Sequence, residues 1–168
     1  EGGIRMENIS SSAGVPVATP DRFFSTVHME NNDFYWGERK GPEDVDRWLW
    51  NSYIWAGTKV DYPVALKSVN LLHPEDEARI KVAYYALFNV NHDSLVYLNG
   101  NLIDESLWSG QDEHAVDTQV PQSDLLADGN TISIETRLSQ GVQYDLLLPN
   151  HFEVNYWRNF VADSDTLD

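Results

Sequence analysis

Residues 95–105 read Leu-Val-Tyr-Leu-Asn-Gly-Asn-Leu-Ile-Asp-Glu, and this stretch decides the fold. Two extended segments flank Asn99-Gly100, and both of these turn residues accept positive φ at low cost, as a two-residue β-hairpin turn requires. A second stretch, residues 125–135, reads Leu-Leu-Ala-Asp-Gly-Asn-Thr-Ile-Ser-Ile-Glu. It predicts a turn that leads into a strand with alternating apolar and polar residues. Together the two stretches predict an antiparallel β-sandwich.

The same alternation continues along most of the chain, for example over residues 78–89. We expect an all-β fold of about nine or ten strands in a single domain, residues 23–160, because turn residues separate short alternating runs and no long helical pattern occurs. Residues 1–22 are rich in Gly, Ser, Ala and Pro, which predicts a linker-like arm. The acidic residues 161–168 are predicted to begin a C-terminal linker.

Two segments carry more specific expectations. The segment 47–57 is predicted to be one strand, with Trp48 and Trp50 on the same face and large apolar groups on both faces. Such a strand is either central and covered on both sides or bears an exposed aromatic row. Residues 142–148 are predicted to form a strand that ends at Pro149, because proline cannot donate a hydrogen bond to a sheet.

Charge and composition restrict the partners. The 168 residues include 11 Lys and Arg against 27 Asp and Glu, a formal net charge of −16. This charge repels phosphate backbones and anionic lipid surfaces, so we expect no nucleic-acid partner. No apolar run approaches the roughly 18 residues of a membrane span, so we expect no membrane insertion. The chain contains no Cys, which excludes disulfides, thiolate metal ligands and a thiol nucleophile within it.

The hairpin, the Gly110-Gln111 pair and the Asp128-Gly129-Asn130-Thr131 turn form a pattern that resembles the galactose-binding-like jelly roll. That fold occurs in carbohydrate-binding modules and in sugar-binding domains of glycosidases. The resemblance implies an antiparallel sandwich whose partner is a polysaccharide or another glycan.

A narrower resemblance covers residues 23–168. It rests on residues 27–36 (VHMENNDFYW), 120–126 (VPQSDLL) and 154–167, which begin VNYWR. These elements resemble the β-sandwich that precedes the catalytic domain in bacterial gingipain-type (family C25) peptidases. The resemblance implies an extracellular or cell-surface protein with an adjacent catalytic domain in the same polypeptide. The family's catalytic dyad is His and Cys, and the absence of Cys means that the activity does not carry over to this chain.

Aromatic residues beside polar groups are the candidate carbohydrate-binding residues. Pyranose rings stack their C–H faces on flat aromatic side chains, while nearby amides, carboxylates or guanidinium groups bond to their hydroxyls. We therefore predict a ligand-binding site among Tyr35, Trp36, Trp108, Gln111, Trp157 and Arg158. We also expect Trp48 or Trp50 to extend such a platform. The alternative is that each Trp packs in the core, as large aromatic residues usually do.

Calcium is the candidate metal, since structural calcium is common in jelly-roll modules by resemblance. The oxygen-rich turn from Glu30 to Asp33 supplies carboxylates that suit Ca²⁺. The alternative is a solvated acidic loop. The five His are scattered without ligand spacing, so a zinc site is not expected.

These observations favour a non-catalytic accessory module of an exported multidomain hydrolase, which binds carbohydrate or packs beside a catalytic domain. One alternative is a purely structural sandwich of a family C25 peptidase. A second is a small glycosidase or lyase, which needs two acids facing one cleft. Asp104 and Glu105 do not meet that need, because neighbours on a strand point to opposite faces.

Overall fold

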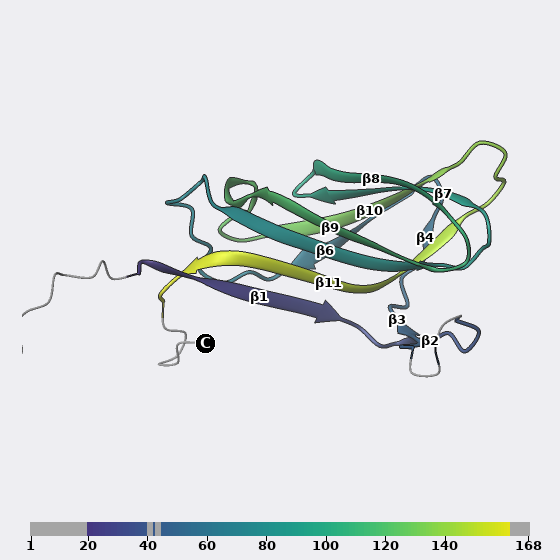
Figure 1. Ribbon diagram of the computed structural model, residues 1–168, viewed down its shortest axis with the longest axis horizontal. Coiled ribbons are helices and arrows are strands. Elements are labelled where there is room, and N and C mark those ends of the chain that lie inside the picture. The colour runs from purple at the N-terminus through teal and green to yellow at the C-terminus, as the bar shows by residue number, and fades with distance from the viewer. Residues whose placement is uncertain (1–19, 40–41, 43–44, 162–168) are drawn as a thin grey trace, which may run out of the picture.

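The computed structural model describes residues 20–39, 42 and 45–161, which form two stacked antiparallel β-sheets (Figure 1). The strands are β1 (Arg22–Glu30), β2 (Phe34–Tyr35), β3 (Trp48–Leu49), β4 (Ile54–Trp55), β5 (Thr58–Val64), β6 (Glu77–Ala86), β7 (Asn91–Leu98), β8 (Asn101–Ser109), β9 (Glu113–Pro121), β10 (Asn130–Leu138) and β11 (Leu146–Asn159). The all-β sandwich is therefore confirmed. The described residues contain eleven strands, against the nine or ten predicted, and three of them, β2, β3 and β4, are only two residues long.

The first sheet has the order β1-β11-β6-β9, and β4 pairs with β11 beside this path. The second sheet has the order β5-β10-β7-β8, while β2 and β3 form a separate two-stranded ribbon. A 3-10 helix, Gln122–Asp124, connects β9 to β10. Within the described part of the chain, no helix is long and apolar enough to cross a membrane. The linker predictions for residues 1–19 and 162–168 fall outside the described residues.

The Asn99-Gly100 turn joins β7 to β8, as predicted, with φ values of 51° and 85°. The Asn99 side chain also reaches the turn that precedes β10. Its Oδ1 accepts a hydrogen bond from the Thr131 backbone at 2.8 Å, and its Nδ2 donates to the Asp124 carbonyl at 2.8 Å. The two stretches that predict the fold are thus joined to each other in space.

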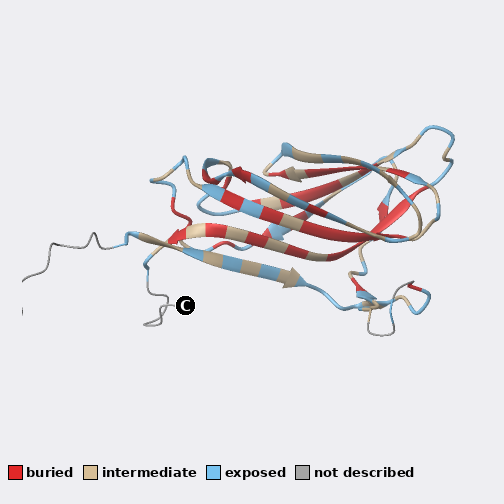
Figure 2. Cartoon of the chain, viewed as in Figure 1, coloured by how far each residue is buried: buried red, intermediate tan, exposed pale blue. Residues whose placement is uncertain are grey.

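The hydrophobic core lies between the inner faces of the two sheets. Ile80 and Val82 from β6 and Phe152 from β11 pack with Ile132 and Ile134 from β10, and all five are fully buried. Bands of buried and less buried residues alternate along β6 and β11 (Figure 2), as the two-residue period of a strand requires. The outer faces of both sheets are therefore the surfaces on which a site can form.

The prediction that a strand ends at Pro149 is wrong. β11 continues through Pro149, and its register against β6 shifts between Pro149 and His151. Asn150 is the extra residue of the resulting β-bulge. A bulge tolerates the missing N–H of proline because the regular ladder is already interrupted there.

The prediction of one strand over residues 47–57 is also wrong. β3 pairs with β2, whereas β4 pairs with β11, so the chain turns between them. This turn separates the two tryptophans. Trp48 is exposed, but Trp50 packs edge-on against Tyr62 and Phe152 of the core, with ring centroids 5.5 and 5.3 Å apart.

Candidate functional site

The ribbon of β2 and β3 covers part of the outer face of the first sheet. We call β2, β3 and residues 36–39 the flap; it lies at the opposite end of the domain from the two ends of the described chain (Figure 1). Leu49 on its underside is fully buried against Tyr85 of β6 and Leu148 of β11. Phe34 and Trp36 pack against the same cluster. The flap thus has an apolar underside that holds it to the sheet.

The upper side of the flap is aromatic and exposed. Tyr35 and Trp48 are direct cross-strand partners, and their ring centroids are 5.2 Å apart in an edge-to-face arrangement. Tyr35 is 56% exposed and Trp48 is 44% exposed, although aromatic residues of this size are usually buried. Side chains alternate between the two faces of a strand. Phe34 and Leu49 occupy the underside of the flap, so the rings of Tyr35 and Trp48 point away from the sheet.

Two further exposed aromatics follow the flap in sequence. Tyr53 packs edge-on against Phe34 of the flap at 6.0 Å, and Trp55 lies opposite Leu146 at the start of β11. Both side chains are about half exposed. We call Tyr35, Trp48, Tyr53 and Trp55 the aromatic surface. Within this set the rings of Tyr35 and Trp48 are in direct contact, and an exposed apolar patch of this kind can mark a binding site.

Gly37 contributes to the position of the Tyr35 ring. A Cβ at this residue would lie 3.3 Å from Cε1 of Tyr35, which is tighter than most real contacts of this type. The absence of a side chain at Gly37 therefore lets the ring lie across the turn.

The predicted site residues are spread over three regions of the domain. Tyr35 belongs to the aromatic surface, whereas the side chain of its neighbour Trp36 packs on the underside of the flap. Trp157 and Arg158 lie at the other end of the first sheet. The Trp157 ring packs edge-on against Phe24 at 5.2 Å, while Arg158 is buried with its guanidinium 5.1 Å from the ring of Phe23.

Trp108 and Gln111 lie near the turn between β8 and β9. The Trp108 ring points into the domain, where it stacks on His114 at 4.9 Å and its Nε1 donates to Ser94 Oγ at 3.2 Å. Gln111 donates from Nε2 to the Leu87 carbonyl at 3.1 Å. The structure therefore does not bring the six predicted residues into one site.

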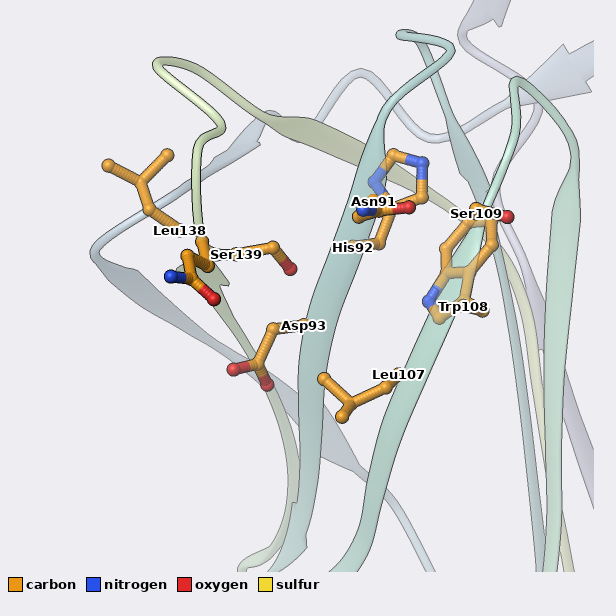
Figure 3. A pocket seen from close by; sticks show the side chains of 9 residues that line it. Asn91, His92, Asp93, Leu107, Trp108, Ser109, Leu138 and Ser139 are labelled. Atoms are coloured by element: carbon orange, nitrogen blue, oxygen red, sulfur yellow. The ribbon is translucent and has the colours of Figure 1, made fainter.

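An open cleft of about 540 Å³ lies beside Trp108, on the outer face of the second sheet. Figure 3 shows the side chains that line it, which come from β7, from β8 and from the end of β10 and the residues after it. Aliphatic, small polar and aromatic side chains therefore all contribute to the lining, the last through His92 and Trp108. Leu107, at its rim, is 77% exposed.

Ion pairs and buried polar groups surround this cleft. Arg137 donates two hydrogen bonds to Asp93, at 2.8 and 3.1 Å, and a third to Glu105, and these carboxylates raise the pKa of its guanidinium. Behind the cleft, Nδ1 of His92 lies 2.8 Å from Asp145 Oδ2, and both side chains are completely buried. Arg137 is paired with Asp93 and Glu105, and His92 is paired with Asp145. These contacts within the protein stabilise the fold, so the same groups are not offered to a ligand.

The donor set for calcium is incomplete in this part of the chain. Asp33 accepts a hydrogen bond from the Asn31 side chain at 2.8 Å, and Glu30 Oε2 lies 3.3 Å from His28 Nε2. Among the described residues, no group of three or more His, Asp or Glu side chains is placed to hold a metal ion. Calcium binding at Glu30 and Asp33 stays a prediction.

The exposed residues Tyr53 and Trp55 were not part of the predicted site, and Trp48 was predicted only as one of two residues, with Trp50, that would extend it. The sequence carried one signal for them, since the aromatic-rich segment 47–57 had large apolar groups on both faces. Only the pairing of β3 with β2, rather than with a long neighbouring strand, determines which of these groups face solvent.

Comparisons with known proteins identify the fold. No family model matches the sequence, and no curated protein matches it. Among solved structures, the latent PorU dimer from Porphyromonas gingivalis matches with a TM-score of 0.59 and 15% identity, over 91% of this chain and 14% of that chain. PorU is a gingipain-type peptidase, so the resemblance stated from the sequence is met at the level of fold.

Two carbohydrate-binding modules give weaker structural likenesses. A family 35 module from an environmental isolate has a TM-score of 0.47 and 10% identity, over 84% of this chain and 99% of that one. A family 36 module in complex with calcium and xylotriose has a TM-score of 0.42 and 15% identity, over 77% and 98%. The chain spans only 14% of the length of PorU.

Proposed function

We propose that this domain is a non-catalytic accessory module of an exported multidomain bacterial hydrolase, and that it binds carbohydrate through the aromatic surface. The observation that carries the proposal is the exposed pair Tyr35 and Trp48 on the flap. Such rings offer apolar faces to the C–H groups of a sugar, and covering them removes apolar area from water.

Polar groups near the aromatic surface suit the hydroxyls of a sugar. Glu38 lies in the flap turn and Asn51 lies two residues after β3, and both residues are exposed. The formal net charge of −16 disfavours uronic acids and sulfated glycans through repulsion at long range. We therefore expect a neutral polysaccharide as the ligand.

An accessory rather than catalytic role is supported by the placement of the acids. Asp104 accepts a hydrogen bond from Ser106, whereas Glu105 accepts one from Arg137 on the outer face of the second sheet. The two carboxylates therefore do not face one cleft, which glycoside hydrolysis by an acid pair requires.

Affinity gel electrophoresis against a panel of neutral and acidic polysaccharides tests the proposal. We expect retardation by at least one neutral polysaccharide, and loss of most of it in Tyr35→Ala and in Trp48→Ala. Phe24→Ala removes an aromatic ring of similar exposure at the other end of the sheet and is the matched control. Equal retardation of all four proteins would place the site elsewhere.

A second candidate function is packing against a neighbouring domain. The observation that favours it is the exposure of Leu107 at the rim of the open cleft, beside the half-exposed Leu138. This candidate predicts that Leu107→Ser weakens association with the neighbouring domain and leaves polysaccharide retardation unchanged. A domain that associates equally well with and without Leu107 contradicts it.

A further inference from the structure

The flap is too small to hold its own conformation. β2 and β3 share only two residue pairs, Phe34 with Leu49 and Tyr35 with Trp48. An isolated two-stranded ribbon is marginal in water even when it is longer. The position of the Tyr35 and Trp48 rings therefore depends on what fastens the flap to the first sheet.

Part of the fastening is apolar, and it acts beneath both strands. Leu49 packs on Tyr85 and Leu148, and Phe34 and Trp36 pack against the same cluster from the β2 side. The Trp50 backbone N–H also donates to the Pro149 carbonyl at 3.0 Å. The end of the turn that follows β2, at residue 39, is held by a different kind of contact.

Arg39 holds that turn. Its backbone N–H donates to the Trp36 carbonyl at 3.2 Å, and its side chain reaches down to the sheet, where only 4% of it remains exposed. Nη2 of Arg39 lies 2.5 Å from Oε2 of Glu113 in β9, and the guanidinium carbon lies 5.3 Å from the centre of the Tyr85 ring. The side chain thus makes a charged hydrogen bond and a cation–π contact at the same time.

The acceptor is itself held in place by the β-bulge. Asn150, the extra residue of β11, donates from Nδ2 to the same Glu113 oxygen at 2.6 Å. The bulge therefore does more than accommodate Pro149, because it places the Asn150 side chain within hydrogen-bond distance of the Glu113 carboxylate. Three elements distant in sequence, the flap turn, β9 and β11, converge on one oxygen atom.

We infer that Arg39, Glu113 and Asn150 form a latch that fixes the flap in the geometry that binds ligand. Arg39 and Glu113 are positioning residues: they contact the sheet beneath the flap and not the exposed rings. The binding part of this inference rests on the proposed function, whereas the latch itself does not. Removing the charge of Glu113 leaves the buried Arg39 guanidinium without its charged partner, which favours release of the flap turn. Removing the charge of Arg39 takes away the group that ties the turn to Glu113, whose carboxylate keeps the hydrogen bond from Asn150.

Hydrogen exchange measured by NMR tests the latch without any ligand. The reporter is the Trp36 amide, which donates to the Arg47 carbonyl at 2.8 Å across the flap. In Arg39→Gln and Glu113→Gln we expect exchange at Trp36 to accelerate about tenfold or more, since local opening sets that rate. Amides of β10 should exchange as in the parent. Arg39→Lys, which keeps the charge, should restore part of the protection.

Arg79→Gln is the matched control. Arg79 pairs with Asp117 across β6 and β9, on the same outer face and at an exposed position. It should leave the Trp36 amide unchanged. Unchanged exchange at Trp36 in Glu113→Gln and Arg39→Gln would overturn the latch, whatever the ligand result.

Polysaccharide binding by the same variants separates the two proposals. We expect the latch variants to bind the neutral polysaccharide about fivefold more weakly than the parent. Faster exchange with undiminished binding would overturn the positioning role. Faster exchange in a domain whose parent form binds no polysaccharide would leave the latch standing and overturn the proposed function.

Discussion

The Asn99 side-chain amide donates a hydrogen bond to Oδ1 of Asn130 at 3.0 Å, and this contact joins the β7–β8 turn to the start of β10. The same Asn130 oxygen accepts the Leu126 backbone N–H at 2.8 Å, so one side chain stabilises the turn before β10 from within. The two adjacent strands β7 and β10 therefore have their common end fixed by a pair of asparagines.

Asn99→Ala should lower the free energy of unfolding by about 2–3 kcal/mol, since it removes several hydrogen bonds worth about 1 kcal/mol each and strains a residue with positive φ. Chemical denaturation provides the measurement. Asn101→Ala, at the exposed start of β8, is the control and should change stability by less than about 0.5 kcal/mol. Similar losses in the two variants would mean that the Asn99 contacts contribute little.

The His92 and Asp145 pair gives a second stability prediction. His92→Phe leaves the completely buried Asp145 carboxylate without its imidazole partner. We expect a loss of about 1–3 kcal/mol in the free energy of unfolding, because a buried acceptor that loses its hydrogen-bond donor keeps its desolvation cost. The exposed pair of Arg79 and Asp117 is the comparison, and Arg79→Ala should cost much less than His92→Phe. A loss in His92→Phe no larger than that in Arg79→Ala would show that the Asp145 side chain finds another partner.

The pKa values of His73 and His114 should lie on opposite sides of the ordinary histidine value. The hydrogen bond that His73 Nε2 donates to the Asp21 carboxylate raises the pKa of His73, while burial lowers the pKa of His114. The stabilising effect of His73 is present below its unfolded pKa and is lost as pH rises through the higher folded pKa. For His114 the pH dependence has the opposite sign. Burial favours its neutral form in the folded state, so the free energy of unfolding falls as the pH drops through the unfolded pKa of this histidine. NMR titration should place His114 below His73, and Asp21→Asn should lower only the pKa of His73. A reversed order would contradict this assignment.

Gly37→Ala should move the Tyr35 ring without unfolding the flap. The added Cβ would lie 3.3 Å from Tyr35 Cε1, so the ring must shift by a few tenths of an ångström. We expect the affinity for polysaccharide to fall about two- to fivefold, and the same change in a Tyr35→Ala background to have no further effect, because contacting residues are not additive. Equal effects in both backgrounds would show that Gly37 acts through something other than this ring.

The fold could be predicted from local signals, and the site could not. Asn99-Gly100 and the alternation in β10 are local features that specify a hairpin and a half-buried strand on their own. The exposure of Trp48 depends instead on a two-residue pairing with Tyr35, thirteen positions earlier in the chain. The burial of Arg158 and the inward direction of the Trp108 ring likewise depend on which long-range neighbours cover them. Aromatic composition therefore indicated a binding surface, but only tertiary pairing identifies its residues.

Isothermal titration calorimetry with neutral oligosaccharides of the polysaccharide class that retards the domain tests the central claim most directly. The intact domain should bind, and Tyr35→Ala/Trp48→Ala should bind at least about tenfold more weakly, a change of about 1.4 kcal/mol. Both proteins should show the same free energy of unfolding, because neither ring contributes to the core. Equal affinity of the two proteins, or no heat of binding with the intact domain, would contradict the assignment of the aromatic surface as a carbohydrate site.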